Sequence, residues 1–286
     1  MNKQLLLLLG AGALAVSIAA RGLDVEEKET IRKTLGFTAS AGSREVRIDN
    51  IDGSIHIVGQ SGSDVVFEVQ KTIRAESRER LQVAQQEVKL DISQRETVIQ
   101  AYVEAPYRCR DGSTNYRGWR YYGYRVQHDF DVRVPEGSSL FLRTVNNGEI
   151  KIQKVSGEYD VENFNGGIEM LEVSGGGRAY ALNGKVKISF RQNPKSDAYF
   201  GSLNGNIDVG FLDGLSADLR FKTFNGGVYT DFPVSYLPSA PPTQERRDGK
   251  FVYKSNEFFG VRVARGGPEI KFDAFNGNIH VLKREK

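Results

Sequence analysis

One segment of the sequence, from Tyr107 to Arg125, concentrates residue types that bind ligands. It reads YRCRDGSTNYRGWRYYGYR and holds five arginines, six aromatic residues and a single acid. Aromatic faces can stack on sugars, bases or peptide anchors, and guanidinium groups pair with phosphate or carboxylate. The candidate binding residues are Tyr107, Arg108, Arg117, Trp119, Arg120, Tyr121, Tyr122 and Arg125. The alternative is a hairpin packed on itself, whose rings cover the N-terminal section while the arginine stems lie over them.

Residues that ordinarily carry catalysis or bind metals follow no recognised pattern. The three histidines are scattered without the spacing of metal ligands, so no metal site is predicted. Nucleophile-elbow, zinc-protease and phosphate-loop motifs do not occur in the sequence. The only cysteine, Cys109, has no partner for an internal disulfide, and His128 is the nearest histidine along the chain. The sequence therefore indicates no cofactor.

Among enzymes, a sugar-cleaving β-helix is the strongest hypothesis, and its chemistry needs two facing carboxylates. Positions in or just after the glycine of a repeat provide the acids Glu149, Glu169 and Asp208. The equivalent positions of other repeats hold Lys187 and Tyr229, so no stripe of acids is expected. We therefore expect a protein that is not an enzyme.

The charge of the chain is nearly balanced, with 39 Lys and Arg against 36 Asp and Glu in 286 residues. This balance excludes a general polyanion-binding surface, and nucleic acid is not an expected partner. The 31 glycines, 16 Phe and 12 Tyr, against two Met, favour turns and strands over helix bundles.

The first residues, MNKQLLLLLGAGALAVSIAA, have the features of a secretory signal peptide. Lys3 gives a positive start, Leu5 to Val16 an apolar run, and Ser17 to Ala19 a small-x-small cleavage site. The alternative is an uncleaved membrane anchor, but a spanning helix needs about 18 to 20 apolar residues. We expect a signal peptide at residues 1–19, cleavage near Ala19–Ala20, and no transmembrane segment in the mature chain.

The element that dominates the sequence is a phrase built on Asn-Gly, as in FKTFNGGVYT from Phe221. Its first five asparagines are separated by 18, 18, 21 and 21 residues, which is typical of a repeat architecture. Apolar and polar residues alternate after each glycine, as in a strand with one buried face. The predicted corners are Asn147 and Gly148, Asn165 and Gly166, Asn183 and Gly184, Asn204 and Gly205, Asn225 and Gly226, and Asn276 and Gly277.

Asn-Gly between strands also suggests a two-residue hairpin. A hairpin at Asn183 would place apolar Leu182 opposite Lys185 on one face, whereas a corner lets both apolar sets point inward. Each strand would then pair with its equivalents in the neighbouring coils, and stacked asparagine amides could form a ladder. Positive φ at the corner would explain the choice of glycine. The predicted fold is all-β: a single-stranded β-solenoid with about 18–21 residues per coil.

Residues 20–128 form the expected N-terminal strand and helix section, a small α+β cap that contains loop 107–125. Its helix is predicted over Glu76–Glu87, because Leu81, Ala84 and Val88 recur at helical spacing. Residues 129–286 form the expected solenoid repeats, interrupted by a Pro-rich loop at 233–250.

These phrases, in this order, resemble the bacterial "putative adhesin" family of exported β-solenoid proteins, whose function is largely unassigned. The resemblance covers residues 37 to 282 and rests on REVRIDNIDGSIHIVGQSGSDVVFEV from Arg44, DFDVRVPEGSSLFLRTVNNGEIKI from Asp129, and GGPEIKFDAFNGNIHV from Gly266. It implies a fold and supplies no catalytic residues.

The sequence therefore predicts an exported, non-enzymatic binding or scaffolding module, periplasmic or extracellular. The expected partner is an envelope polymer, a lipid headgroup or an envelope protein. The alternatives are a carbohydrate-active β-helix enzyme and a self-assembling envelope scaffold.

Overall fold

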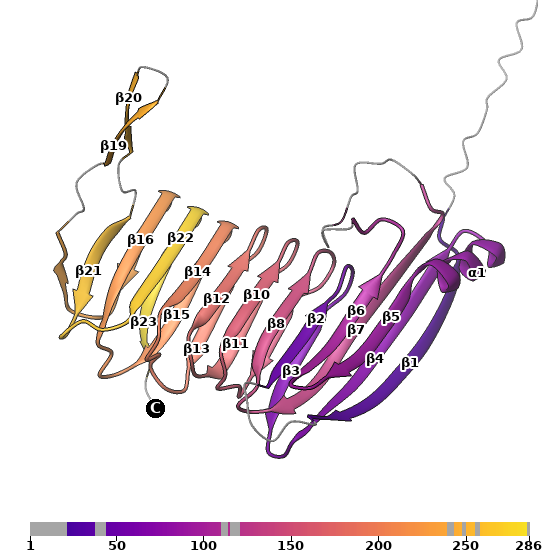
Figure 1. Cartoon of the computed structure of the whole chain (residues 1–286). Helices are drawn as coiled ribbons and strands as arrows, with labels where there is room; N and C mark the ends of the chain where they lie inside the picture. Colours follow the sequence, from indigo (N-terminus) through magenta and orange to yellow (C-terminus); the bar gives the residue numbers. More distant parts are fainter. Residues whose placement is uncertain are drawn as a thin grey trace, which may run out of the picture.

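The computed structural model describes residues 22–37, 44–109, 114, 121–238, 243–247, 250–254 and 258–284 (Figure 1). The predicted signal peptide, with its cleavage position, lies outside these residues. The fold is all-β, as the sequence predicted, and consists of two large mixed sheets with one helix.

Sheet A has ten strands. In spatial order these are β1 (Val25–Gly36), β4 (Asp64–Ala75), β7 (Tyr124–Pro135), β3 (Ile55–Gln60), β9 (Ile150–Gln153), β11 (Ile168–Val173), β13 (Val186–Phe190), β15 (Ile207–Leu212), β23 (Ile279–Arg284) and β17 (Val228–Thr230).

Sheet B has eleven strands. In spatial order these are β18 (Val234–Tyr236), β21 (Phe259–Val263), β16 (Ala217–Asn225), β22 (Glu269–Asn276), β14 (Ala198–Asn204), β12 (Gly177–Ala181), β10 (Tyr159–Asn163), β8 (Ser139–Thr144), β2 (Glu45–Asp49), β6 (Val98–Glu104) and β5 (Lys89–Arg95). A separate antiparallel ribbon is formed by β19 (Thr243–Arg247) and β20 (Lys250–Lys254).

Asn-Gly corners carry the chain from sheet B to sheet A, so the two strands that flank a corner do not pair with each other. Strand β12, before Asn183, pairs in parallel with β10 and β14 in sheet B. Strand β13, after Gly184, pairs in parallel with β11 and β15 in sheet A. The predicted pairing between equivalent strands is confirmed, and the hairpin alternative is wrong. We call a sheet B strand, its corner and the following sheet A strand a rung.

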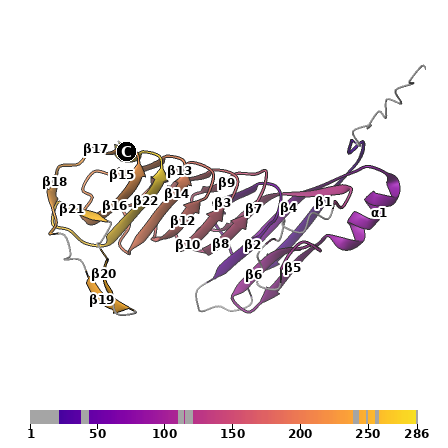
Figure 2. The same cartoon turned by 90° about the horizontal axis from the view of Figure 1, so that it is seen from above.

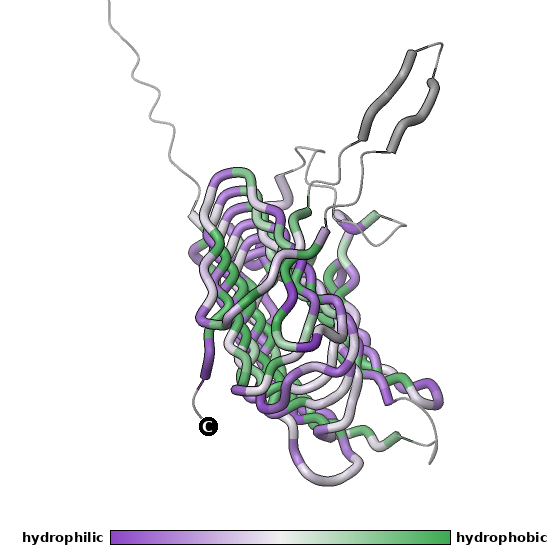
Figure 3. The backbone as a smooth tube through the Cα atoms, turned by 90° about the vertical axis from the view of Figure 1, so that its left-hand side faces the viewer, coloured by the Kyte–Doolittle hydropathy of each residue, from purple (hydrophilic) through white to green (hydrophobic). Residues whose placement is uncertain are grey.

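The core lies between the sheets, where the inward residues of every rung meet. Val161, Ala179 and Phe200 are aligned in one buried row of sheet B, and Phe272 and Phe221 continue it. The rings of Phe221 and Phe272 stack with their centroids 5.0 Å apart. Figure 3 views the molecule along this stack and shows hydrophobic and hydrophilic residues alternating along the strands.

Two rungs are out of sequence order, whereas the sequence suggested a linear stack. The C-terminal rung, β22–β23, lies between β14–β15 and β16–β17. Likewise β2–β3 lies between β6–β7 and β8–β9. The 50 residues between Asn225 and Asn276 include β18, the β19–β20 ribbon and β21. This length of chain allows β22–β23 to be inserted between β14–β15 and β16–β17.

Antiparallel strands cover both ends of the stack (Figure 2). At the C-terminal end, β21 pairs with β16 and β18. At the other end, β1 pairs with β4, and helix α1 (Arg78–Glu87) contacts β4 and β7. The helix begins after Ser77, whose side chain accepts a hydrogen bond from the backbone N–H of Arg80, and it buries Leu81 and Ala84 as predicted. The expected boundary at residue 128 falls inside β7.

Steric contact between neighbouring rungs explains the corner glycines. None of the six predicted corner glycines has positive φ, so that explanation is wrong. A Cβ on Gly205 would instead lie 2.2 Å from the carbonyl oxygen of Gly184, and one on Gly166 would lie 1.9 Å from that of Gly148. Successive corners are stacked backbone on backbone, and any side chain would push the rungs apart.

We predict that Gly205→Ala lowers the free energy of unfolding by about 3 kcal/mol, at the upper end of ordinary overpacking, because the opposing atom belongs to the backbone and cannot rotate away. Chemical denaturation measures this loss. The matched control is Gly137→Ala, because a Cβ there meets no atom within 4 Å. Its effect should stay within about 0.5 kcal/mol. Equal stability of the two variants would contradict the stacked-backbone explanation.

Candidate functional site

The predicted Arg-aromatic segment is described in part. Arg117, Trp119 and Arg120 lie outside the described residues. Tyr107 and Tyr122 pack edge to face with their ring centroids 5.5 Å apart, and Tyr122 lies 5.6 Å from Tyr124. The hydroxyl of Tyr121 donates a hydrogen bond of 2.8 Å to Glu76, just before helix α1. The described part of the segment therefore packs against the N-terminal section.

Arg108 lies inside this packing, with 3% of its side chain exposed. Its Nη1 donates to Oδ1 of Asp49 at 2.9 Å, its Nε donates to the carbonyl of Val103 at 2.8 Å, and its guanidinium lies 4.4 Å from the ring centroid of Tyr102. Burial raises the pKa of Asp49, and the charge of Arg108 opposes that shift. Arg108 thus neutralises a buried carboxylate, and its guanidinium does not face solvent.

We predict that Arg108→Met lowers the free energy of unfolding by about 3 kcal/mol or more, because it leaves Asp49 buried without its counter-charge. The matched control is Arg32→Met, because Arg32 pairs with Glu68 at 2.9 Å on the exposed face of β1 and β4. That change should cost less than about 1 kcal/mol. Chemical denaturation of the two variants measures both losses, and similar losses would mean that Arg108 has no special structural role.

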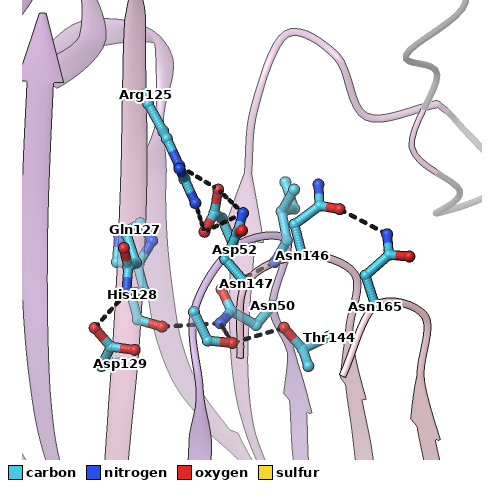
Figure 4. Close-up of polar contacts among 12 residues, drawn as sticks. Asn50, Asp52, Arg125, Gln127, His128, Asp129, Thr144, Asn146, Asn147 and Asn165 are labelled. Carbon is cyan, nitrogen blue, oxygen red and sulfur yellow. Dashed lines mark hydrogen bonds and ion pairs between the residues drawn. The ribbon is translucent and has the colours of Figure 1, made fainter. Parts of the chain in front are cut away.

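Arg125 and Asp52 form a two-point ion pair at the N-terminal end of the corner row (Figure 4). Nε of Arg125 lies 2.8 Å from Oδ2 of Asp52, and Nη2 lies 3.0 Å from Oδ1. Asp52 occupies the corner of the β2–β3 rung and forms a parallel bridge with Asn146. Asn147, with φ of 54°, directs its Nδ2 to the same carboxylate at 3.3 Å.

The predicted asparagine ladder is present along the outside of the corners. Each Nδ2 donates to the Oδ1 of the asparagine on the next rung, at 2.8 to 2.9 Å. In spatial order the ladder runs through Asn225, Asn276, Asn204, Asn183, Asn165 and Asn146. The last position corrects the prediction: Asn146 joins the ladder, whereas Asn147 is an additional residue in the left-handed region that pairs with Asp52.

A second, buried row of polar side chains lies on the inside of the corners. Thr144 donates to the carbonyl of Gly53 at 2.9 Å, Asn163 to that of Gly148 at 3.0 Å, and Ser202 to that of Gly184 at 2.9 Å. The sequence analysis missed this row. The sequence feature that could have revealed this row is a polar residue two places before the corner asparagine. In an alternating strand, that inward position would otherwise hold an apolar residue.

His128 is fully buried in β7, and its ring nitrogens have no hydrogen-bond partner among the described residues. Burial, with a smaller contribution from the charge of Lys71, lowers the pKa of His128 to about 4. Below pH 6.5 the unfolded chain gains a proton that the folded chain binds only near pH 4. Stability is therefore lost as the pH falls from 6.5 towards 4.

We predict that His128→Leu removes this component of the pH dependence. Between pH 7 and pH 5, His128 should contribute a loss of about 2 kcal/mol in the parent chain, and the variant should lack it. Chemical denaturation of both proteins at several pH values measures the difference between the two slopes, in which carboxylate titrations common to both cancel. Parallel slopes would contradict the prediction.

The outward acids predicted as candidates are separated by other residues. In sheet A, Lys187 lies between Glu169 and Asp208 and bonds to Glu169 at 2.9 Å. On the next rung, Nδ1 of His280 lies 2.5 Å from Oδ1 of Asp208, and the ring of Tyr229 stacks on that of His280. Glu149 contacts Lys151.

A groove that the sequence analysis missed opens on the outer face of sheet B, near the C-terminal end of the stack. It has a volume of about 680 Å³. We call it the aromatic groove; its lining residues are Tyr180, Tyr199, Ser202, Leu203, Lys222, Thr223, Phe224, Asp273, Ala274 and Phe275. The signal for it was present in the repeats, where aromatic residues occupy outward positions of neighbouring rungs.

Side chains that line the aromatic groove contact one another through a hydrogen bond and a stacked pair of rings. The Tyr199 hydroxyl donates to Oδ2 of Asp273 at 3.2 Å. Burial and the Asp273 charge raise the pKa of Tyr199, so the hydroxyl stays protonated. The rings of Phe224 and Phe275 stack with centroids 4.9 Å apart and an angle of 7° between them. Phe224 is 73% exposed and Phe275 is 45% exposed.

No protein-family model and no curated protein matches the sequence. Among solved structures, a "putative cell adhesion protein" from Clostridium sporogenes aligns over 90% of this chain and 100% of its own, with 10% identity and a TM-score of 0.41. A "putative adhesin" from Bacteroides fragilis aligns over 90% and 97%, with 8% identity and a TM-score of 0.40. The names of both proteins match the family that the sequence resembles.

Proposed function

We propose that this chain is an exported, non-enzymatic binding module of the cell envelope, adhesin-like in architecture. We further propose that its stacked rungs form a β-solenoid of about 18 to 21 residues per coil. The parallel, in-register pairing of equivalent strands and the continuous asparagine ladder support this description. Export rests on the signal peptide predicted for residues 1–19. Within the described ranges, no helix is long and apolar enough to cross a membrane.

The observation that carries the binding proposal is the aromatic groove. Elsewhere the outer faces of the stack are largely neutralised by contacts between rungs, such as Arg178 with Asp160 at 3.4 Å and Lys187 with Glu169 at 2.9 Å. The aromatic groove departs from this pattern because it exposes the stacked rings of Phe224 and Phe275 next to polar side chains. Concave, mostly apolar surfaces with a few convergent polar groups are typical of binding sites.

The carboxylates of the molecule support a binding role over glycoside hydrolysis. Glu68 and Asp131 lie directly opposite each other on β4 and β7 and line a cavity of about 240 Å³. A glycosidase needs one of its two acids to hold a proton, which requires a raised pKa. Arg32 donates to Glu68 at 2.9 Å and lowers its pKa, while His56 contacts Asp131 at 3.2 Å.

The two ends of the stack support a module that does not assemble end to end. Edge strand β1 exposes an almost continuous run of charged residues, VEEKETIRK, whereas β18 at the opposite end exposes Val234 and Tyr236. Exposed charges on an edge strand oppose pairing with another strand. Growth by end-to-end stacking would require both ends to be complementary, which these are not.

We predict that the purified mature chain co-sediments with the insoluble envelope of the producing cell. The double variant Phe224→Ala, Phe275→Ala should reduce the bound fraction at least tenfold, because exposed aromatic anchors commonly carry about 2 kcal/mol each in an interface. The matched control is Tyr229→Ala, which removes a 55% exposed ring on the sheet A side of the same rung as Phe224.

A second comparison uses Trp119→Ala with Arg120→Ala, in the segment first predicted to bind. Reduced binding of this variant with unchanged binding of the Phe224 and Phe275 variant would move the binding surface to loop 107–125. Failure of the parent chain to co-sediment would overturn the proposed function.

A further inference from the structure

Two outward rows of sheet B run in register across the rungs and define the aromatic groove. Nearest the corners is an apolar ridge, which in spatial order consists of Phe164, Leu182, Leu203, Phe275 and Phe224. Two residues earlier on each strand is a second row, which consists of Glu162, Tyr180, Gly201, Asp273 and Lys222. Both rows lie perpendicular to the strands and parallel to the axis of the stack.

Gly201 lies in the second row, beside the depression that forms the groove, and makes room there for two tyrosine rings. A Cβ at this position would lie 2.6 Å from Cδ2 of Tyr180 and 2.9 Å from Cε1 of Tyr199, so both rings lie over the glycine backbone. Tyr199 is fixed there by its hydrogen bond to Asp273. A side chain at Gly201 would displace these rings. The two tyrosines, which line the groove, therefore occupy the space that a side chain at position 201 would fill.

The ridge forms the apolar wall of this depression. The two phenylalanines at its end, Phe224 and Phe275, stack on each other and remain largely exposed. Large aromatic groups that stay in solvent on neighbouring strands form a contiguous apolar patch, which in soluble proteins marks an interaction surface. The facing sides of these two rings cover each other, so the ridge offers ring edges and outer faces as an apolar surface for the C–H face of a sugar or another flat apolar group.

The charges of the groove determine which ligand chemistry it suits. Asp273 and Lys222 are directly adjacent in register and have opposite signs. Because the charges of Asp273 and Lys222 offset each other, the groove has no net charge that would attract a phosphate headgroup or an acidic polymer. A carboxylate has about four acceptor positions, which leaves capacity for hydroxyl donors beyond the bond from Tyr199. A ligand with many hydroxyls and no net charge satisfies these groups without burying an unpaired charge.

We propose that the aromatic groove binds an uncharged, hydroxyl-rich glycan chain that lies along the stack, with its sugar faces on the ridge and its hydroxyls towards Asp273 and Lys222. This inference rests on the proposed function and specifies its ligand. A linear polymer fits the geometry, because both rows continue over several rungs in one direction. A peptide added as a strand would instead pair along a sheet edge, and this groove lies on a sheet face.

Isothermal titration calorimetry of the purified mature chain with cellohexaose and with chitohexaose tests the inference. We expect binding of at least one of these neutral oligosaccharides, with affinity little changed between 50 and 500 mM salt because no ligand charge is screened. Phe224→Ala and Asp273→Asn should each lower the affinity at least tenfold. Tyr229→Ala should leave it within twofold, which also controls for general effects of aromatic removal at this end of the stack.

Three results would overturn the inference: no binding of either oligosaccharide, binding that survives Phe224→Ala and Asp273→Asn together, or groove-dependent binding of phosphatidylglycerol vesicles in place of glycans. Circular dichroism of each variant establishes that it is folded. The two proposals fail separately. Groove-dependent co-sedimentation with the envelope but no oligosaccharide binding would retain the proposed function and exclude the glycan. Oligosaccharide binding without envelope co-sedimentation would retain the glycan as ligand of the groove and exclude the proposed envelope function.

Discussion

The backbone contact between successive corner glycines is the constraint on which the rest of the structure depends. A Cβ on Gly166, Gly184 or Gly205 would lie about 2 Å from the carbonyl oxygen or carbon of the glycine on the neighbouring rung. Only with this side chain absent do the corners stack closely enough for the outer asparagine amides to bond to one another. The same approach brings the buried hydroxyl of Ser202 within reach of a glycine carbonyl. Glycine is therefore required here by contact between rungs, not by local backbone conformation.

In-register stacking converts each position of the repeat into a row that runs the length of the molecule. Inward rows become the core, as in the aligned residues Phe200, Phe272 and Phe221, and outward rows become the surface. In one outward row of sheet A, Lys151, Glu169, Lys187 and Asp208 alternate in charge, and Lys187 pairs with Glu169 on the neighbouring rung. The aromatic groove is a distinct surface, in which exposed phenylalanine rings adjoin polar side chains. Gly201 lies next to it and makes room for the rings of Tyr180 and Tyr199, which line it.

Much of the fold could be predicted from the sequence, because corners, alternation and the N-terminal helix are local patterns. Arg108 could not be assigned from local sequence. The composition of its segment suggested a ligand contact, but tertiary packing places Arg108 over Tyr102 and against Asp49. The rung order could not be predicted for a different reason. The corners at Asn204, Asn225 and Asn276 carry the same Asn-Gly motif, so the rung of Asn204 could accept either that of Asn225 or that of Asn276 by the local rules alone. Because the residues of the aromatic groove are brought together by this rung order, the groove could not be predicted either.

The choice between these two rungs is made by outward residues of β14–β15 that fit the C-terminal rung. Gly210 leaves space for the stem of Arg284, whose Nη1 donates to the carbonyl of Phe190 at 3.0 Å. Asp208 contacts His280 in sheet A, and Tyr199 bonds to Asp273 in sheet B. These contacts are non-local and involve side chains that face solvent, whereas the shared corner motif gives equal support to either neighbour. The Tyr199–Asp273 pair thus belongs both to the contacts that select the rung order and to the wall of the aromatic groove. Correct assembly of the C-terminal rung is therefore a condition for the aromatic groove to exist, because the groove takes its residues from β14, β22 and β16 in that spatial order.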